Sequence, residues 1–285
     1  MKILYHIALC LMLQGAGRLA GQELMHKASK VDEKKYTKGI DAISIRGEKA
    51  SISVKGWSGT EVKILLRPVS RNTDKTQAIT DLKYIRYEAV QEGSQLVVTN
   101  SFEGELEKIN SNLSMEIEVL APFSMPVQIT NLYGPVLIEN FATVTANVSF
   151  GSLSLANISS DCSLTARYAD IGLNSISGKL VIKAEKSDIR AKALGGTSVI
   201  ECSYGEANLD LAPYGQLHVN AYRTGLTVEV DVYEDYSYRL EAKNGYVYLP
   251  QGKQIRDKVV DIQHAGASRL VDLNTSYCDI NIITK

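Results

Sequence analysis

The sequence predicts an all-β protein, and three observations support that class. A motif of about 18 residues recurs through the second half of the chain. Apolar and polar residues alternate on both sides of the residue that heads each motif, a pattern typical of two strands with one buried face each. Of the 285 residues, 45% are apolar, which is enough to bury a continuous core. We expect a single-stranded β-solenoid, a β-helix-like stack with two strands per coil.

The N-terminus has the features of a secretory signal peptide. After Met1 and Lys2, an apolar run extends to Leu13, and small residues follow up to Gly21. We expect residues 1–21 to be removed on export, leaving the mature chain in the periplasm, on the outer surface or secreted. No later segment has the roughly 20 apolar residues that a transmembrane helix needs.

The next two segments connect this leader to the repeats. Residues 22–39 are polar and charged, and we expect a tether there. Residues 40–126 begin with one coil of the alternating pattern, over 43–57, and then leave it. The sequence predicts a short helix over 73–80 and a hairpin between 84–90 and 96–98. We expect this β excursion to cap the N-terminal end of the stack, where strand edges would otherwise be unpaired.

The repeats occupy residues 127–285. Their heading residues are 17, 18, 18, 18, 19, 21 and 33 positions apart, so the connections lengthen toward the C-terminus. Residues three and five positions after each heading residue are all apolar, and residues three positions before it are all polar. Stacking the coils in chain order, about 4.8 Å apart, would bury the apolar columns and pair the backbone groups. The heading residues are Tyr133, Phe150, Tyr168, Lys186, Tyr204, Arg223, Asn244 and Tyr277.

Two other all-β folds fit the pattern less well. A three-sided left-handed β-helix also has 18-residue coils, but it needs an aliphatic residue every six positions. Stepping by six from Leu153 gives Ser159 and Thr165, which excludes that fold. An immunoglobulin-like sandwich has short alternating strands, but nothing in it keeps columns of residues in register over many copies.

Three motifs carry a family resemblance. They are Ile-Ser-Val-Lys-Gly-Trp-Ser-Gly-Thr-Glu-Val at 52–62, Val-Leu-Ala-Pro at 119–122, and the repeated Tyr-Gly-x-Val-x-Ile strings. In these motifs and their order, the chain resembles the bacterial adhesin family of the DUF4097 type, related to head GIN domain proteins. The resemblance covers nearly all of the mature chain. It implies a β-solenoid exported to the cell envelope or surface, a role in adhesion and no catalytic residues. Lys186, Arg223 and Asn244 depart from the aromatic pattern of the heading column.

The aromatic heading residues are the candidate ligand contacts. Tyr133, Phe150, Tyr168 and Tyr204 would form a ladder that Lys186 interrupts. If the rings are exposed, they could stack on sugars. Each ring is followed by a small residue, which is typical of an aromatic side chain covering a bend. We therefore favour packing at the corner over ligand contact.

A broken column of acidic residues lies two positions after the heading residues, at Asp170, Asp188, Glu206 and Asp279. Stacked carboxylates could bind calcium or cleave a polysaccharide. Other residue types interrupt the column, however, so we favour solvated acids that cap turns.

The cysteines and histidines give no catalytic or metal-binding pattern. Cys162 and Cys202 lie two coils apart, and Cys278 lies three coils beyond Cys202, so the separations are roughly 10 and 14 Å against a limit of about 7 Å for a disulfide. We expect free thiols. His218 and His264 have no serine or cysteine near them in a nucleophile motif. We expect no enzyme activity, no cofactor and no metal.

The leading functional hypothesis is an exported, non-catalytic envelope or surface protein, an adhesin or structural scaffold that presents a β-solenoid surface. Its partner would be an envelope or host glycan or protein. Nucleic acid is not expected, because 31 basic and 32 acidic residues leave a net charge of −1. The alternatives are a carbohydrate-binding or carbohydrate-cleaving solenoid and a periplasmic signalling accessory.

Overall fold

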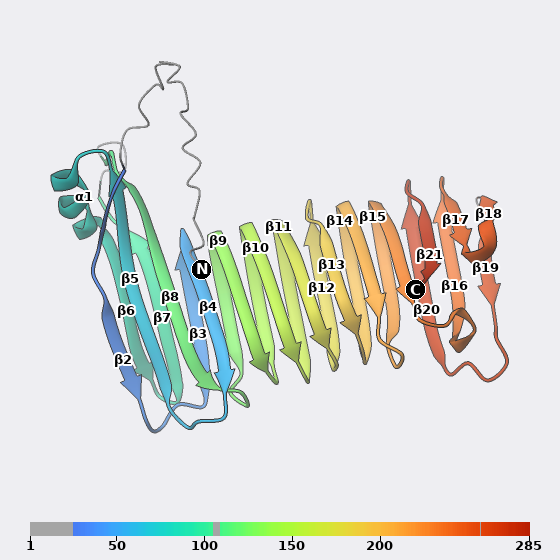
Figure 1. The fold of residues 1–285 in the computed structure, drawn as a ribbon, viewed down its shortest axis with the longest axis horizontal. Helices are drawn as coiled ribbons and strands as arrows, with labels where there is room; N and C mark the ends of the chain where they lie inside the picture. The colour runs from blue at the N-terminus through green and yellow to red at the C-terminus, as the bar shows by residue number, and fades with distance from the viewer. Residues whose placement is uncertain (1–24, 105–108, 257) are drawn as a thin grey trace, which may run out of the picture.

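The computed structural model describes residues 25–104, 109–256 and 258–285. Nearly all regular structure in these residues is β-strand, and the strands join in one sheet (Figure 1). The all-β class is therefore confirmed. The expected signal peptide, residues 1–21, lies outside the described residues. Within the described part of the chain, no helix is long and apolar enough to cross a membrane.

The central part of the sheet consists of strands that each contain one repeat of the sequence, or half of one, and we call each repeat a layer. These strands are β9 (Val127–Phe141), β10 (Val144–Ile158), β11 (Asp161–Ile176), β12 (Lys179–Glu185), β13 (Ile189–Leu194), β14 (Thr197–Leu211) and β15 (Gln216–Val230). Neighbouring layers run parallel (Figure 1). Leu153 pairs with Val136 on one side and Ile171 on the other, so the offset between layers equals the sequence period. Residues of one column are therefore neighbours in space.

Each layer bends at its heading residue, which has a left-handed backbone conformation. The heading residues have φ between 48° and 63°. At the bend, two successive side chains point outward: Arg167 and Tyr168 are exposed, whereas Ala166 and Ala169 are buried. The in-and-out alternation resumes in the opposite phase, so the segments before and after the bend face the same interior.

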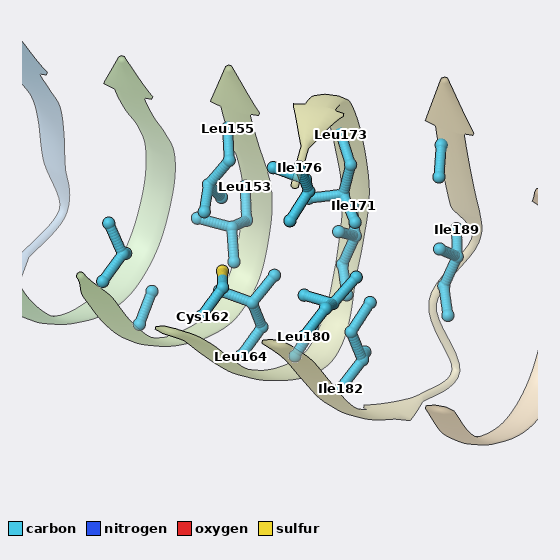
Figure 2. Packing of buried hydrophobic residues seen from close by; sticks show 14 of the residues in the cluster. Leu153, Leu155, Cys162, Leu164, Ile171, Leu173, Ile176, Leu180, Ile182 and Ile189 are labelled. Atoms are coloured by element: carbon cyan, nitrogen blue, oxygen red, sulfur yellow. The ribbon is translucent and has the colours of Figure 1, made fainter. Parts of the chain in front are cut away.

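The inward columns form ladders of buried apolar side chains. Leu153, Ile171 and Ile189 lie after the bend, and Leu164 and Ile182 lie before it; all are at most 1% exposed. Figure 2 shows these side chains meeting between the two arms of the bent strands. Full burial of such a side chain stabilises the fold by about 1.5–3 kcal/mol.

The N-terminal end contains one more layer, as the alternation over 43–57 predicts. The strands here are β3 (Ala42–Glu48), β4 (Ala50–Trp57), β5 (Val62–Asn72), β6 (Ile85–Glu92), β7 (Gln95–Phe102) and β8 (Asn112–Pro122). β3 and β4 pair in parallel with β9 on one side and with β7 and β8 on the other. β6 and β5 then pair antiparallel with β7 and β8.

Two local elements of this region match the sequence-based expectation. The predicted hairpin is formed by β6 and β7, with Val90 opposite Val97. The predicted helix is α1 (Lys75–Asp81), whose first turn is capped by the Asp74 side chain. Residues 22–39, expected to be a tether, contain β1 (His26–Ser29) and β2 (Asp32–Tyr36), and both pair antiparallel with β5.

The C-terminal layers are not stacked in chain order, and that expectation is wrong. The strands are β16 (Tyr236–Lys243), β17 (Tyr246–Leu249), β18 (Lys253–Arg256), β19 (Val259–Ile262), β20 (Arg269–Ser276) and β21 (Ile280–Thr284). Val271 of β20 pairs with Leu217 of β15 on one side and Tyr238 of β16 on the other. The last layer of the chain therefore fills the gap between β15 and β16, while β18 and β19 pair antiparallel with β17 and β16. Cys278 consequently lies two layers from Cys202 rather than three.

Candidate functional site

The heading residues of successive layers form a row along one edge of the stack, and we call their side chains the corner ridge. In spatial order the ridge consists of Tyr133, Phe150, Tyr168, Lys186, Tyr204, Arg223, Tyr277 and Asn244. Every residue of the row before Asn244 is aromatic or cationic. Because the bend turns two successive side chains outward, these groups lie outside the core. The sequence predicted the positions of the bends, but not this exposure.

The first three rings of the corner ridge stack on one another. Tyr133, Phe150 and Tyr168 are each 41–46% exposed. The ring centroids of each neighbouring pair are 5.1 Å apart, with interplanar angles of 22° and 6°. This is the offset stacking that aromatic pairs prefer. The rings therefore pack on each other and remain partly exposed to solvent.

Lys186 continues the row instead of interrupting it. Its Nζ donates a hydrogen bond to the Tyr168 hydroxyl at 2.6 Å and lies 4.8 Å from the centroid of the same ring. The hydrogen bond to Tyr168 raises the pKa of the lysine. A positive charge is thus held at the end of the three-ring stack.

The far half of the corner ridge is a cluster around Arg223. The guanidinium carbon lies 5.9 Å from the ring centroid of Tyr204, 5.5 Å from that of Tyr222 and 5.7 Å from that of Tyr277. Tyr222 makes edge-on contacts with the other two rings. Sequence analysis named Tyr204 but missed Tyr222 and treated Arg223 as a departure from the pattern. The sequence contained the signal, because five of the eight heading residues are aromatic, two are cationic and one is Asn244.

A second corner in the four layers headed by Tyr133, Phe150, Tyr168 and Lys186 provides a comparison within the molecule. Seven residues after the heading residue the backbone is again left-handed, with φ between 54° and 62°. The residues at this corner are Asn140, Asn157, Ser175 and Ala193. Small residues and asparagine tolerate the conformation best. The left-handed backbone conformation therefore does not require an aromatic side chain.

Close approach between layers explains the glycine that follows several of the heading residues. A Cβ added to Gly151 would lie 2.1 Å from the Gly134 carbonyl oxygen, and one added to Gly245 would lie 2.3 Å from the Cys278 carbonyl oxygen. Backbone contact between layers thus requires glycine at these positions.

The acidic column caps backbone groups, as expected. The Asp170 carboxylate accepts a hydrogen bond from the Asp188 N–H at 3.2 Å, and the Asp188 carboxylate accepts one from the Glu206 N–H at 3.0 Å. Farther along, Asp279 accepts from the Tyr246 N–H at 2.8 Å. Each bond joins one layer to the next. In the described parts of the chain, no group of three or more histidine, cysteine or acidic side chains is arranged to hold a metal ion.

The remaining candidates lie apart from the corner ridge or inside the core. Cys162 and Cys202 are buried and unpaired, and burial raises the pKa of these thiols to about 12 and about 11. His218 Nδ1 lies 3.0 Å from Asp272 Oδ2 on the outer face of β15. His264 Nδ1 lies 2.7 Å from the Tyr236 carbonyl oxygen.

A shallow hollow runs beside the Arg223 half of the corner ridge. It has a volume of about 550 Å³ and crosses the outer faces of β11, β12, β14, β15 and β20. Tyr222 belongs to both the hollow and the Arg223 cluster. Hydroxyl and amide groups of Ser203, Asn220, Asn274 and Ser276 line the part of the hollow nearest the cluster.

Comparison with known proteins yields structural similarity without a family. No protein-family model matches the chain, and no curated protein matches it. Membership of the DUF4097 family is therefore not confirmed.

Three solved structures align over most of the chain, each at 12% identity. A "putative cell adhesion protein" from Clostridium sporogenes covers 91% of this chain and 100% of its own, with a TM-score of 0.29. A "putative adhesin" from Parabacteroides merdae has a TM-score of 0.39, and a "putative lipid binding protein" from Parabacteroides distasonis has one of 0.34. Each of these two alignments covers 90% of this chain and 96% of the other. Likeness of this degree carries no argument about function.

Proposed function

We propose that the chain is an exported, non-catalytic adhesive protein, a β-solenoid that binds its partner along the corner ridge. The parallel layers, offset by the sequence period, support the solenoid. The observation that carries the binding role is a contrast between the two corners in the layers headed by residues 133–186. The first corner has three exposed rings and a lysine, and the second has asparagine, serine and alanine on the same backbone conformation.

The contrast matters because folding does not require rings at these positions. Any residue with a Cβ on a left-handed backbone costs about 1–2 kcal/mol, and a ring that is more than 40% exposed gains only part of its possible burial energy. Aromatic residues and arginine are also the types that dominate binding energy at interfaces. A row of them on the surface is typical of a recognition surface.

The hydrogen bonds of the acidic column favour a binding role over glycan cleavage. A glycosidase needs one carboxylate as an acid and another as a base or nucleophile. In the acidic column, Asp170, Asp188 and Asp279 instead accept hydrogen bonds from backbone N–H groups of adjoining layers. These bonds give the column a structural role.

The test is a binding screen of secreted residues 22–285 against envelope glycans and host matrix proteins, with an assay for released reducing ends. We expect at least one ligand to bind and no sugar to be released. Failure to bind any ligand, or hydrolysis of a bound glycan, would contradict the proposed function.

A further inference from the structure

The Arg223 cluster is a preformed cationic site. Three exposed tyrosine rings lie 5.5–5.9 Å from the guanidinium and surround it. Rings at this distance attract the cation through their π faces. The contacts restrict the arginine side chain before any ligand arrives, which lowers the entropy cost of binding.

The N–H groups of Arg223 remain available. Among the described residues, no ion pair or side-chain hydrogen bond involves Arg223; its guanidinium contacts the three rings, and its charge acts on the Cys278 thiol. Two other exposed arginines differ: Arg167 pairs with Glu185 at 3.2 Å, and Arg190 pairs with Asp188 at 3.2 Å. Arg223 thus keeps its planar set of five donors, which suits a carboxylate or a sulfate.

The surroundings of the cluster match a hydroxyl-rich ligand. The neighbouring hollow offers the hydroxyls of Ser203 and Ser276 and the amides of Asn220 and Asn274, groups that both donate and accept hydrogen bonds. Its charged lining residues are paired with each other, Glu185 with Arg167 and Glu201 with Lys183. A peptide backbone usually binds by adding a strand to a free sheet edge, whereas this hollow crosses the outer faces of paired strands. A sugar chain bears hydroxyls on all sides and needs no such edge.

We propose that Arg223 with Tyr204, Tyr222 and Tyr277 binds an acidic polysaccharide, a chain whose sugars carry carboxylate or sulfate groups. The guanidinium binds the anionic group, and sugar hydroxyls contact the tyrosines and the polar hollow. This inference rests on the proposed adhesive function and names the ligand class for one half of the corner ridge.

The experiment measures the affinity of residues 22–285 for polygalacturonate and for a sulfated galactan, with uncharged galactan and poly-glutamate as comparison polymers. Arg223→Gln removes the charge, and Arg223→Lys keeps it but loses the planar donors. Arg190→Gln is the matched control, because it removes one exposed arginine from the opposite side of the bend. Thermal melts of each variant verify that it is folded.

We expect one or both acidic polysaccharides to bind, with affinity reduced about tenfold or more by Arg223→Gln, reduced less by Arg223→Lys and changed less than about twofold by Arg190→Gln. Added salt should weaken binding by the unaltered chain more than binding by Arg223→Gln. The two acidic polymers distinguish carboxylate from sulfate as the preferred group.

Several results would overturn the inference. Equal affinity of Arg223→Gln and the unaltered chain would remove Arg223 from the site. Equal binding of poly-glutamate, with the same dependence on Arg223, would indicate an acidic peptide ligand instead. Binding of only an uncharged glycan or a matrix protein would refute the acidic ligand and leave the adhesive function standing, whereas no binding in either screen would refute both.

Discussion

The Phe150 ring lies parallel to the Tyr168 ring, at an interplanar angle of 6° and a centroid distance of 5.1 Å, although both residues have a left-handed backbone. Two effects on stability therefore oppose each other at each position. Stacking contributes about 0.5–1.5 kcal/mol, and the left-handed conformation costs about 1–2 kcal/mol for a residue with a Cβ.

The first prediction separates those two effects at Phe150. Phe150→Ala loses the stack and keeps the strain, so we expect it to lower the free energy of unfolding by about 1 kcal/mol. Phe150→Gly loses the stack and relieves the strain, so it should be at least as stable as Phe150→Ala. At Thr165, in an extended strand, the order should reverse, with glycine about 0.5–1 kcal/mol below alanine. Urea titrations of the four variants measure this, and the same order at both positions would refute the strain argument.

The second prediction concerns the buried columns. Ile171→Asp places a charge in a ladder where the side chain is 1% exposed, and we expect it to destabilise the protein by about 4 kcal/mol or more. Thr165→Asp changes an exposed side chain on the preceding arm of the same layer and should cost less than about 1 kcal/mol. Equal shifts in the thermal melt would contradict the assignment of inward and outward columns.

The third prediction tests the capping role of the acidic column. Asp188→Ala leaves the Glu206 N–H without its acceptor, and we expect a loss of about 1 kcal/mol. Glu206→Ala is the control, because within the described residues the Glu206 carboxylate accepts no hydrogen bond; its cost should stay within about 0.5 kcal/mol. If the two variants unfold at the same urea concentration, the layer-to-layer bond contributes nothing measurable.

The fourth prediction concerns the thiols of residues 22–285. Thiolates are the reactive form, and burial raises the pKa of Cys162 and Cys202 to about 12 and about 11, so neither should react with a thiol reagent at pH 8 in the folded protein. After denaturation without reductant, all three cysteines should react. A count of one would reveal a disulfide and contradict the layer positions of the cysteines.

The repeat positions could be predicted because burial imposes a simple pattern on the sequence. Columns such as Leu153, Ile171 and Ile189 are apolar in every layer, and the change of phase at the heading residue marks the bend. The order of the last layers could not be predicted, because Leu217, Val271 and Tyr238 satisfy the same column in any order. Only the pairing of β20 with both β15 and β16 decides it.

The candidate site was predicted in position but not in character. The sequence identified Tyr133, Phe150, Tyr168 and Tyr204 as corner residues. The small residue that follows each ring in the sequence favoured the interpretation that the rings cover the bend. The small residues instead allow close backbone contact, as at Gly151. The exposure of the rings depends on the left-handed backbone at the bend, and the pattern of apolar residues does not predict that conformation.

The central claim is that the corner ridge binds the partner and that the opposite corner does not. The most direct measurement compares Phe150→Gly with Asn157→Gly, two substitutions at the two left-handed corners of the same layer, for affinity toward the ligand identified by the screen. We predict that both variants keep their melting temperature within a few degrees, that Phe150→Gly loses about tenfold or more in affinity and that Asn157→Gly binds like the unaltered chain. Full binding by a folded Phe150→Gly variant would contradict the claim.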